Sequence, residues 1–341
     1  KELVDAFFKI QENFASIFTL GLIGDQKQRI YTDGKDNMLS IIPKDWEKPV
    51  KKMNYRCAKR IIQLANTIGK DIDIHAEQNP REDANDGFVR LFVVQQHEGI
   101  NKDEVEQTIM KIISKDAEDE KWTGIDADVK ILTLEHMMAA RRLGFDSFFA
   151  PFNKVSKYQM TFLQGAVPEI DFFTKIILPI AESMKGDGRV ALEILKEYSP
   201  LLSKQNTEKP YELYLKCREK AVDVASMVNE NKTIREIVKI ISDSQLINLP
   251  NVVDRASNLV SDDVRESDDE ELTAWVNTMD LPIEVIRKYD DYVNHRTRFD
   301  THQGVKGLEF DRVLVIIDDS EAKGFMFSYD KLFGVKNLSE T

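Results

Sequence analysis

A polar, glycine-containing loop at 301–310 that runs into an aliphatic segment at 313–317 is the feature that most constrains this chain. The aliphatic segment reads Val-Leu-Val-Ile-Ile and has acidic residues on both sides. Unbroken aliphatic runs of this kind are typical of buried parallel strands, which are covered on both faces. We therefore expect an α/β layer here, with the polar loop facing whatever lies between two such layers.

Upstream of this segment, strand-like and helix-like patterns alternate. Apolar runs at 88–94 and 129–134 predict strands, and apolar residues at helical spacing predict helices at 102–114 and 135–143. Gly144 follows the second helix, at a position where glycine commonly ends helices. This alternation is typical of a parallel α/β architecture.

Between about residues 152 and 292 the strand-like patterns almost disappear, and helical spacing dominates. The predicted helices lie at 170–184, 190–198, 211–229, 233–242 and 272–277. Because the strand pattern returns at 313–317, we expect a large all-α block that interrupts an α/β domain.

Composition narrows the class of protein. With 341 residues, 42% hydrophobic and 31% charged, the chain is long enough for two or three domains with ample core. No apolar run approaches the roughly 18 residues that a membrane span needs, and no signal-peptide pattern opens the sequence. Cys57 and Cys217 lack metal-ligand spacing, so we expect buried thiols and a cytoplasmic protein.

The net charge of −12 argues against a surface coated with phosphate contacts. It leaves room for a nucleic-acid site, because single strands are often bound along a local basic and aromatic track.

Three short patterns carry the chemistry. The first follows an apolar run at 19–23, predicted as a strand, and reads Gly-Asp-Gln-Lys-Gln-Arg-Ile-Tyr over 24–31. The second is Asn-Tyr-Arg at 54–56, just before a helical pattern at 58–66. The third is the loop at 301–310, which ends in Lys-Gly-Leu-Glu-Phe.

In this order, the three patterns resemble motifs III, IV and V of superfamily-one DNA helicases of the UvrD/Rep type. That family also has a helical insertion in its second RecA-like domain, between motifs IV and V, where this chain has its helical block. The resemblance implies an ATP-dependent enzyme that translocates on single-stranded DNA and unwinds duplex.

The resemblance also implies roles for individual residues. ATP would lie between two RecA-like domains, where Gln28 senses the terminal phosphate and Arg56 reaches it from the second domain. An aromatic face suits a purine, so Tyr55 would stack on adenine, and Glu309 would bond the ribose. The expected DNA contacts are Tyr31, Thr301, His302 and Gln303.

Several features depart from the family. The positions after Tyr31 that often hold a tryptophan and an arginine are Asp33 and Gly34 here, so that DNA contact is missing or supplied elsewhere. The family often has histidine three positions before Lys306, where this chain has Gln303, and His302 is shifted by one.

No Walker loop and no acidic strand end for Mg²⁺ is found, so the Mg²⁺ ligands are expected outside this chain. We therefore expect a helicase fragment that hydrolyses no ATP alone.

The predicted domains are a remnant of the first RecA-like domain at 1–48, a second RecA-like domain at 49–150 and 295–341, and a helical accessory insertion at 151–294. A rival interpretation is a non-catalytic DNA- or protein-binding module on a degenerate helicase scaffold. The sequence leaves open the polarity, the oligomeric state and the pathway, whether repair, recombination or defence against phage.

Overall fold

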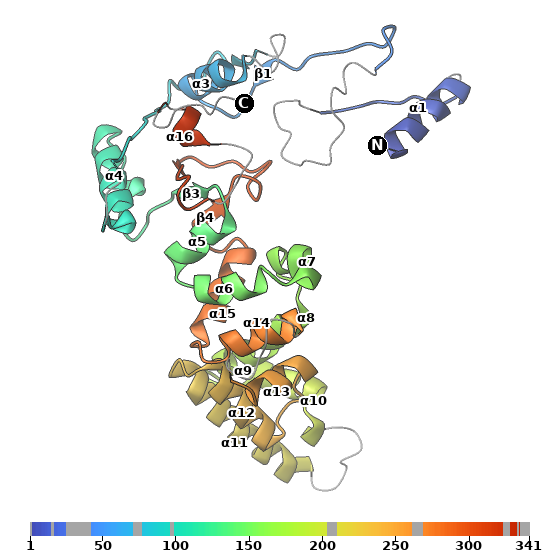
Figure 1. Cartoon of the computed structure of the whole chain (residues 1–341), viewed down its shortest axis with the longest axis vertical. Helices are drawn as coiled ribbons and strands as arrows, with labels where there is room; N and C mark the ends of the chain where they lie inside the picture. The colour runs from blue at the N-terminus through green and yellow to red at the C-terminus, as the bar shows by residue number, and fades with distance from the viewer. Residues whose placement is uncertain are drawn as a thin grey trace. The chain divides into compact units, whose positions relative to one another are not determined.

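The computed structural model describes residues 2–14, 17–24, 42–70, 77–95, 99–202, 210–260, 269–322, 328–332 and 334. The chain divides into two compact units, residues 1–123 and residues 124–341 (Figure 1). Each unit is described by itself below.

The first unit contains helices around one small parallel strand pair. Its helices are α1 (Glu2–Phe14), α3 (Lys59–Gly69), α4 (Lys102–Asp116) and the 3₁₀ turn η2 (Glu120–Trp122). The strands β1 (Met53–Asn54) and β2 (Asn79–Pro80) pair in parallel, with Met53 opposite Asn79. Asn101 caps α4 through its side chain, which accepts a hydrogen bond from the Glu104 N–H.

The second unit contains one parallel sheet, whose strands come from both ends of this part of the chain. These are β3 (Lys130–Thr133), β4 (Phe299–Thr301) and β5 (Val313–Ile316), in the order β4-β3-β5. The register places Thr133 between Thr301 and Ile316. Helix α5 (His136–Leu143) packs against β3 and β4.

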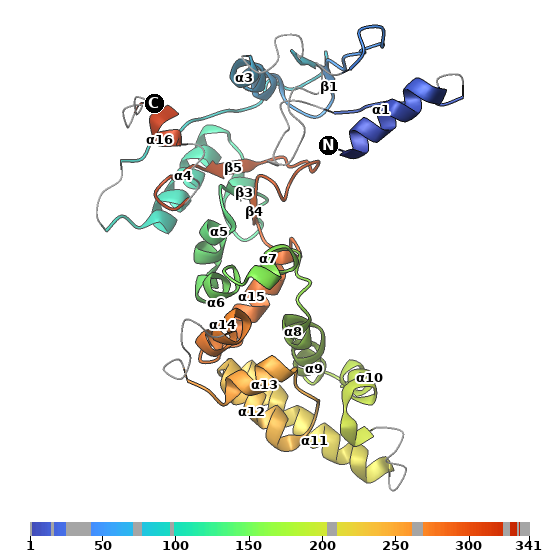
Figure 2. The same cartoon turned by 45° about the vertical axis from the view of Figure 1, so that its right-hand side comes forward.

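A long run of helices separates β3 from β4 (Figure 2). After α5 these are α6 (Asp146–Phe152), η3 (Ser156–Tyr158), α7 (Gln159–Leu163), α8 (Pro168–Asp171), η4 (Phe172–Ile177), α9 (Leu178–Ser183), α10 (Arg189–Tyr198), η5 (Pro200–Leu202), α11 (Pro210–Asn229), α12 (Ile234–Ser244), α13 (Asn251–Ser257), α14 (Glu270–Thr278) and α15 (Glu284–Val293). Helix α16 (Tyr329–Leu332) follows β5.

An aromatic core holds the sheet-proximal helices together. Phe152 of α6 meets Trp275 of α14 edge-on, with 4.9 Å between ring centroids. Phe162 of α7 stacks on Tyr289 of α15 at 4.6 Å. The Tyr289 hydroxyl donates to the Phe162 carbonyl at 2.5 Å, so this buried phenol has a partner.

The mixed α/β class expected from the sequence is confirmed, with strands on both sides of a helical block. The helix stop at Gly144 is confirmed too: it adopts φ +74° and its N–H bonds back into α5. None of the helices in the described part of the chain has the length and hydropathy that crossing a bilayer requires.

Three local strand predictions were wrong. The run at 313–317 forms the strand β5, but this strand lies at the edge of the sheet with Val313 and Val315 exposed, so it is not covered on both faces. The apolar runs at 19–23 and 88–94 form no strand, and Ile23 and Val93 are exposed instead of covered by a paired neighbour. The helix predicted over 170–184 is confirmed as a continuous helical run from Pro168 to Ser183, which contains the π-helical segment η4. Leu178 N–H bonds Phe173 O, five residues back, and the next residue, Pro179, has no N–H to continue an α-helical ladder.

Candidate functional site

The Asn-Tyr-Arg turn of the first unit is folded by its asparagine. Asn54 Oδ1 accepts hydrogen bonds from the backbone N–H groups of Arg56 (3.0 Å) and Cys57 (2.8 Å). Its Nδ2 donates to Gln78 Oε1 at 2.7 Å, which ties the turn to the segment entering β2. Asparagine suits this place because its short side chain can close a turn onto the following backbone. The turn leaves Tyr55 (74% exposed) and Arg56 on the surface of their unit.

Helix α3 begins directly after this turn and is capped by a neighbouring loop. Its N-cap, Ala58, offers no side-chain acceptor, and the Lys59 and Arg60 N–H groups instead donate to the Asn85 and Asp86 carbonyls, both at 2.9 Å. Gly87, the next residue of that loop, has φ +75° and lies so close to α3 that a Cβ there would overlap the Cβ of Ala58. The loop at 85–87 thereby satisfies two N–H groups that a helix start leaves unpaired.

The predicted DNA-facing loop of the second unit starts at the carboxyl end of β4. Thr301 is 2% exposed, and its Oγ1 accepts the Gly304 N–H at 3.3 Å while its carbonyl accepts the Val305 N–H at 3.3 Å. The Thr301 hydroxyl therefore stabilises the turn at the start of the loop. His302 and Gln303, the next two side chains, are exposed.

A buried carboxylate anchors this loop. Asp300, 3% exposed, places Oδ2 3.2 Å from Lys130 Nζ and 2.8 Å from His295 Nδ1, and its Oδ1 accepts the Thr301 N–H at 2.9 Å. Lys130 is also buried, and its Nζ donates to the Thr297 carbonyl at 3.2 Å. Buried charges are retained when they are paired and hydrogen-bonded, as these are.

Gly304 completes the anchor. A Cβ at this position would overlap Asp300 Oδ1, so only glycine lets the loop close over the carboxylate. We call Asp300, Lys130, His295, Thr301 and Gly304 the Asp300 cluster. The loop then turns again at Gly307 (φ +88°) and continues to Glu309, which is exposed.

Helix α5 connects the sheet to the aromatic core. His136, at the start of α5, has Nδ1 2.7 Å from the Tyr292 hydroxyl and stacks on Phe149. Burial lowers the pKa of His136, with opposing contributions from Asp300, which raises it, and His302, which lowers it. Burial likewise raises the pKa of Tyr292 above its ordinary value.

The predicted site residues fall into three groups. Gln28 and Tyr31 lie outside the described residues. Tyr55 and Arg56 share one turn of the first unit. The remaining four, Thr301, His302, Gln303 and Glu309, share the loop between β4 and β5 of the second unit.

The sequence interpretation missed the Asp300 cluster. One signal was present: Lys130 interrupts the aliphatic run at 129–134, and a cation in a buried strand needs an anionic partner. The identity of that partner was not readable, because Asp300 is 170 positions away, on the far side of the helical block (300 − 130).

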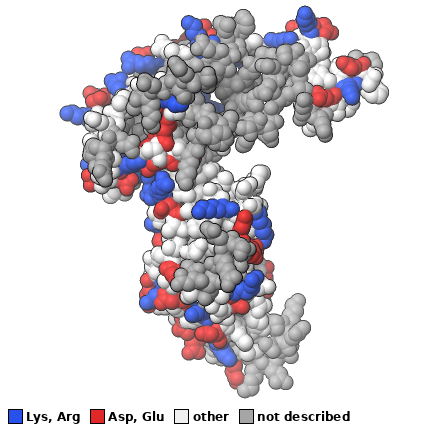
Figure 3. All heavy atoms as spheres, in the orientation of Figure 1, with Lys and Arg blue, Asp and Glu red and all other residues white. Residues whose placement is uncertain are grey.

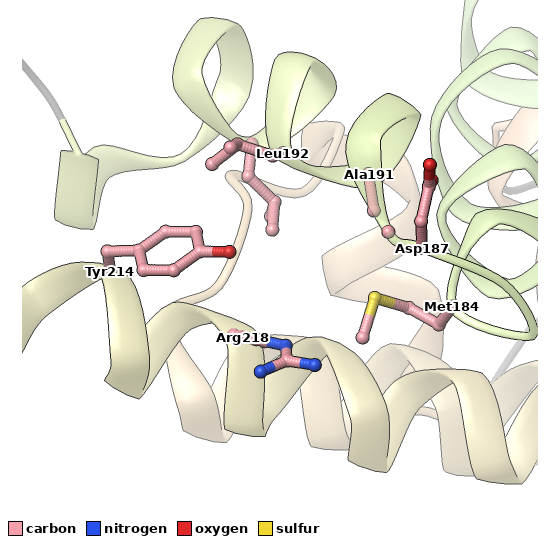
Figure 4. Close-up of a pocket in the computed structure, with 8 residues that line it drawn as sticks. Met184, Asp187, Ala191, Leu192, Tyr214 and Arg218 are labelled. Carbon is pink, nitrogen blue, oxygen red and sulfur yellow. The ribbon is translucent and has the colours of Figure 1, made fainter.

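A separate hollow lies between α10 and α11 (Figure 4). Tyr214, Leu192 and Met184 border it, with Asp187 and Arg218 at its edge. It contains none of the predicted site residues. Among the residues that the structure describes, no group of three or more His, Cys, Asp and Glu side chains could hold a metal ion.

The surface carries both signs of charge. On the face drawn in Figure 3, the described acidic and basic side chains of the second unit are interspersed over the helical block. This face therefore shows no broad basic field of the kind that binds phosphate backbones without sequence preference.

The chain matches no protein-family model, no curated protein and no solved structure.

Proposed function

We propose that this chain is part of an ATP-dependent DNA helicase that translocates on single-stranded DNA. The observation that carries the proposal is the loop at 301–310, whose first residues leave the carboxyl end of β4 and whose Lys-Gly-Leu-Glu-Phe part leads into β5. In parallel α/β sheets, ligands are bound by loops at the carboxyl ends of strands. The order of the three helicase-like patterns along the chain supports the same conclusion.

In this proposal, ATP is bound by RecA-like domains through the contacts that the helicase resemblance assigns. Tyr55 would stack on the adenine of ATP, Arg56 would bond its terminal phosphate, and Glu309 would bond its ribose. The exposed aromatic face of Tyr55 fits the first role. Gln28 would sense the same phosphate, and ATP hydrolysis, assisted by Mg²⁺, would supply the free energy for stepping.

DNA would be contacted by the exposed residues of the loop, His302 and Gln303, and by Tyr31. Thr301 would contribute by shaping the loop, since its hydroxyl accepts the Gly304 N–H. An imidazole and a primary amide both donate hydrogen bonds to phosphate oxygens, which suits a strand held without sequence preference.

The DNA assignment can be tested on the chain itself. In fluorescence anisotropy with a labelled oligo-dT strand, His302→Ala/Gln303→Ala should weaken binding roughly tenfold, because one or two polar contacts of about 1 kcal/mol each are lost. Gln164→Ala, which removes an exposed amide at the end of α7, should leave binding unchanged. Absent binding, or equal binding by all three proteins, would defeat the assignment.

The ATP assignment needs a protein that joins this chain to an upstream Walker loop. There, Arg56→Ala should lower the ATPase kcat by about 10³-fold, the scale of an arginine that stabilises a transferring phosphoryl group. DNA binding should survive. Arg60→Ala, an exposed arginine one turn further along, is the matched control. Full turnover by the Arg56 variant would defeat the role given to Arg56. No turnover by the joined protein without any substitution would favour the rival, a non-catalytic DNA- or protein-binding module on a helicase scaffold.

A further inference from the structure

The loop at 301–307 is held by one residue to which the helicase-like patterns give no role. We propose that Asp300 is a positioning residue whose carboxylate holds this loop in the shape that meets a DNA strand. The link to DNA rests on the function proposed above, whereas the role of Asp300 in fixing the loop does not.

The two oxygens of Asp300 face different partners. Oδ1 accepts the Thr301 N–H at 2.9 Å and lies against Gly304, where a side chain would overlap it. Oδ2 lies 3.2 Å from Lys130 Nζ and 2.8 Å from His295 Nδ1. One carboxylate thus joins the loop to β3 and to the segment that follows α15.

The backbone at the root of the loop is fixed by the same neighbours. Thr133 Oγ1, on β3, lies 3.3 Å from the Asp300 carbonyl and 3.1 Å from the Glu135 carbonyl, and its single proton is shared between them. The loop cannot shift at its root without breaking bonds to β3. The side chains of a functional loop can be placed accurately only when a rigid element fixes the residue at which the loop begins.

Asp300 acts on the loop and has no direct route to a DNA strand. It is 3% exposed, and a carboxylate repels phosphate. The side chains that follow Thr301, His302 and Gln303, are exposed and carry the proposed contacts. A change at Asp300 therefore alters binding only by altering the loop.

Three variants separate this role from a general loss of stability. Asp300→Asn keeps the shape but removes the anion that pairs with Lys130 and turns an amide toward its ammonium group, which offers no acceptor. Lys130→Met leaves the buried carboxylate short of its cation. The double variant removes both faults, because no buried charge is left without its partner and the amide oxygen at position 300 still accepts the Thr301 N–H.

Loop order is read by trypsin cleavage after the exposed Lys306, followed by mass spectrometry, with no DNA present. Each single variant should be cleaved roughly tenfold faster than the wild type, as expected when a charge-assisted hydrogen bond no longer closes the loop. The double variant should return to within about threefold of the wild type. Asp280→Asn, which breaks an ion pair with Arg235 elsewhere in the same unit, should leave cleavage at Lys306 unchanged.

Affinity for the oligo-dT strand should follow the same order: highest for the wild type, close to it for the double variant, and lowest for the two single variants. Wild-type cleavage of Asp300→Asn, or a double variant no better than the single ones, would overturn the positioning role. A loosened loop with unchanged DNA affinity would overturn its link to DNA. If the wild type binds no DNA, the proposed function fails, and the cleavage rates still decide whether Asp300 holds the loop.

Discussion

His136 lies where the small sheet meets the aromatic core, and its surroundings decide whether the imidazole carries a charge. The ring stacks on Phe149 at 6.4 Å and reaches the Tyr292 hydroxyl at 2.7 Å. Burial lowers its pKa; among nearby groups Asp300 opposes this effect and His302 adds to it. The folded chain therefore holds His136 neutral at a pH where an unfolded chain, with a pKa of about 6.5, is already protonated.

This difference predicts a loss of stability in mild acid. The contribution of His136 is fully present above the unfolded pKa of about 6.5 and is lost as the pH falls toward the lower folded pKa, by at most about 1.4 kcal/mol per pH unit. Urea denaturation between pH 7.5 and 5 should show a falling free energy of unfolding, and His136→Gln should flatten that slope. Equal slopes in both proteins would contradict the assignment. Asp280, whose pKa is lowered by its hydrogen bond with Arg235, titrates below this window.

Helix α3 gives a prediction at the scale of one element. Gly87→Ala should destabilise the start of α3 twice over, by placing Ala at φ +75° (about 1 kcal/mol) and by forcing its Cβ onto Ala58 (about 1–3 kcal/mol). Gly99→Ala is the matched control, because Gly99 has φ +82° but no atom within 4 Å of its virtual Cβ. Hydrogen exchange at the Lys59 and Arg60 amides measures the effect. Equal exchange in both variants would show that the contact with Ala58 contributes nothing.

The elements that could be predicted from the sequence are those that are stabilised by interactions between residues close in sequence. Thr233 and Glu236 form a reciprocal capping box at the start of α12, and the helix predicted from residue 233 is confirmed. The run at 88–94 had the composition of a strand, yet a strand also needs a paired neighbour, which composition does not reveal. The loop at 301–310 was recognisable from its motif, whereas its anchor depends on a residue of β3 far away in sequence. Local pattern therefore predicted helices and motif positions, and long-range pairing decided the rest.

The second unit is organised by one long-range closure. Thr133 and Asp300 are 167 positions apart, and a hydrogen bond joins them within the sheet. All the helices from α5 to α15 lie between these two residues in sequence. Because closing so long a connection is entropically unfavourable, the folded helical block, which brings its own ends together, favours pairing of β3 with β4. The site loop thus depends on the fold of the helical block that separates β3 from β4 in sequence.

The charge of the whole chain makes a prediction about how it binds DNA. A net charge of −12 gives little attraction at long range, so the proposed binding must come from a few local contacts. For single strands, the logarithm of the affinity falls with the logarithm of the salt concentration by about 0.7 per phosphate neutralised. The loop at 301–307 carries one lysine, Lys306, so it would neutralise about one phosphate and give a slope of about −0.7. Anisotropy titrations with oligo-dT between about 50 and 300 mM salt would measure it. A slope steeper than about −4 would mean that a broad basic surface binds the strand, and the loop would lose its place as the main contact.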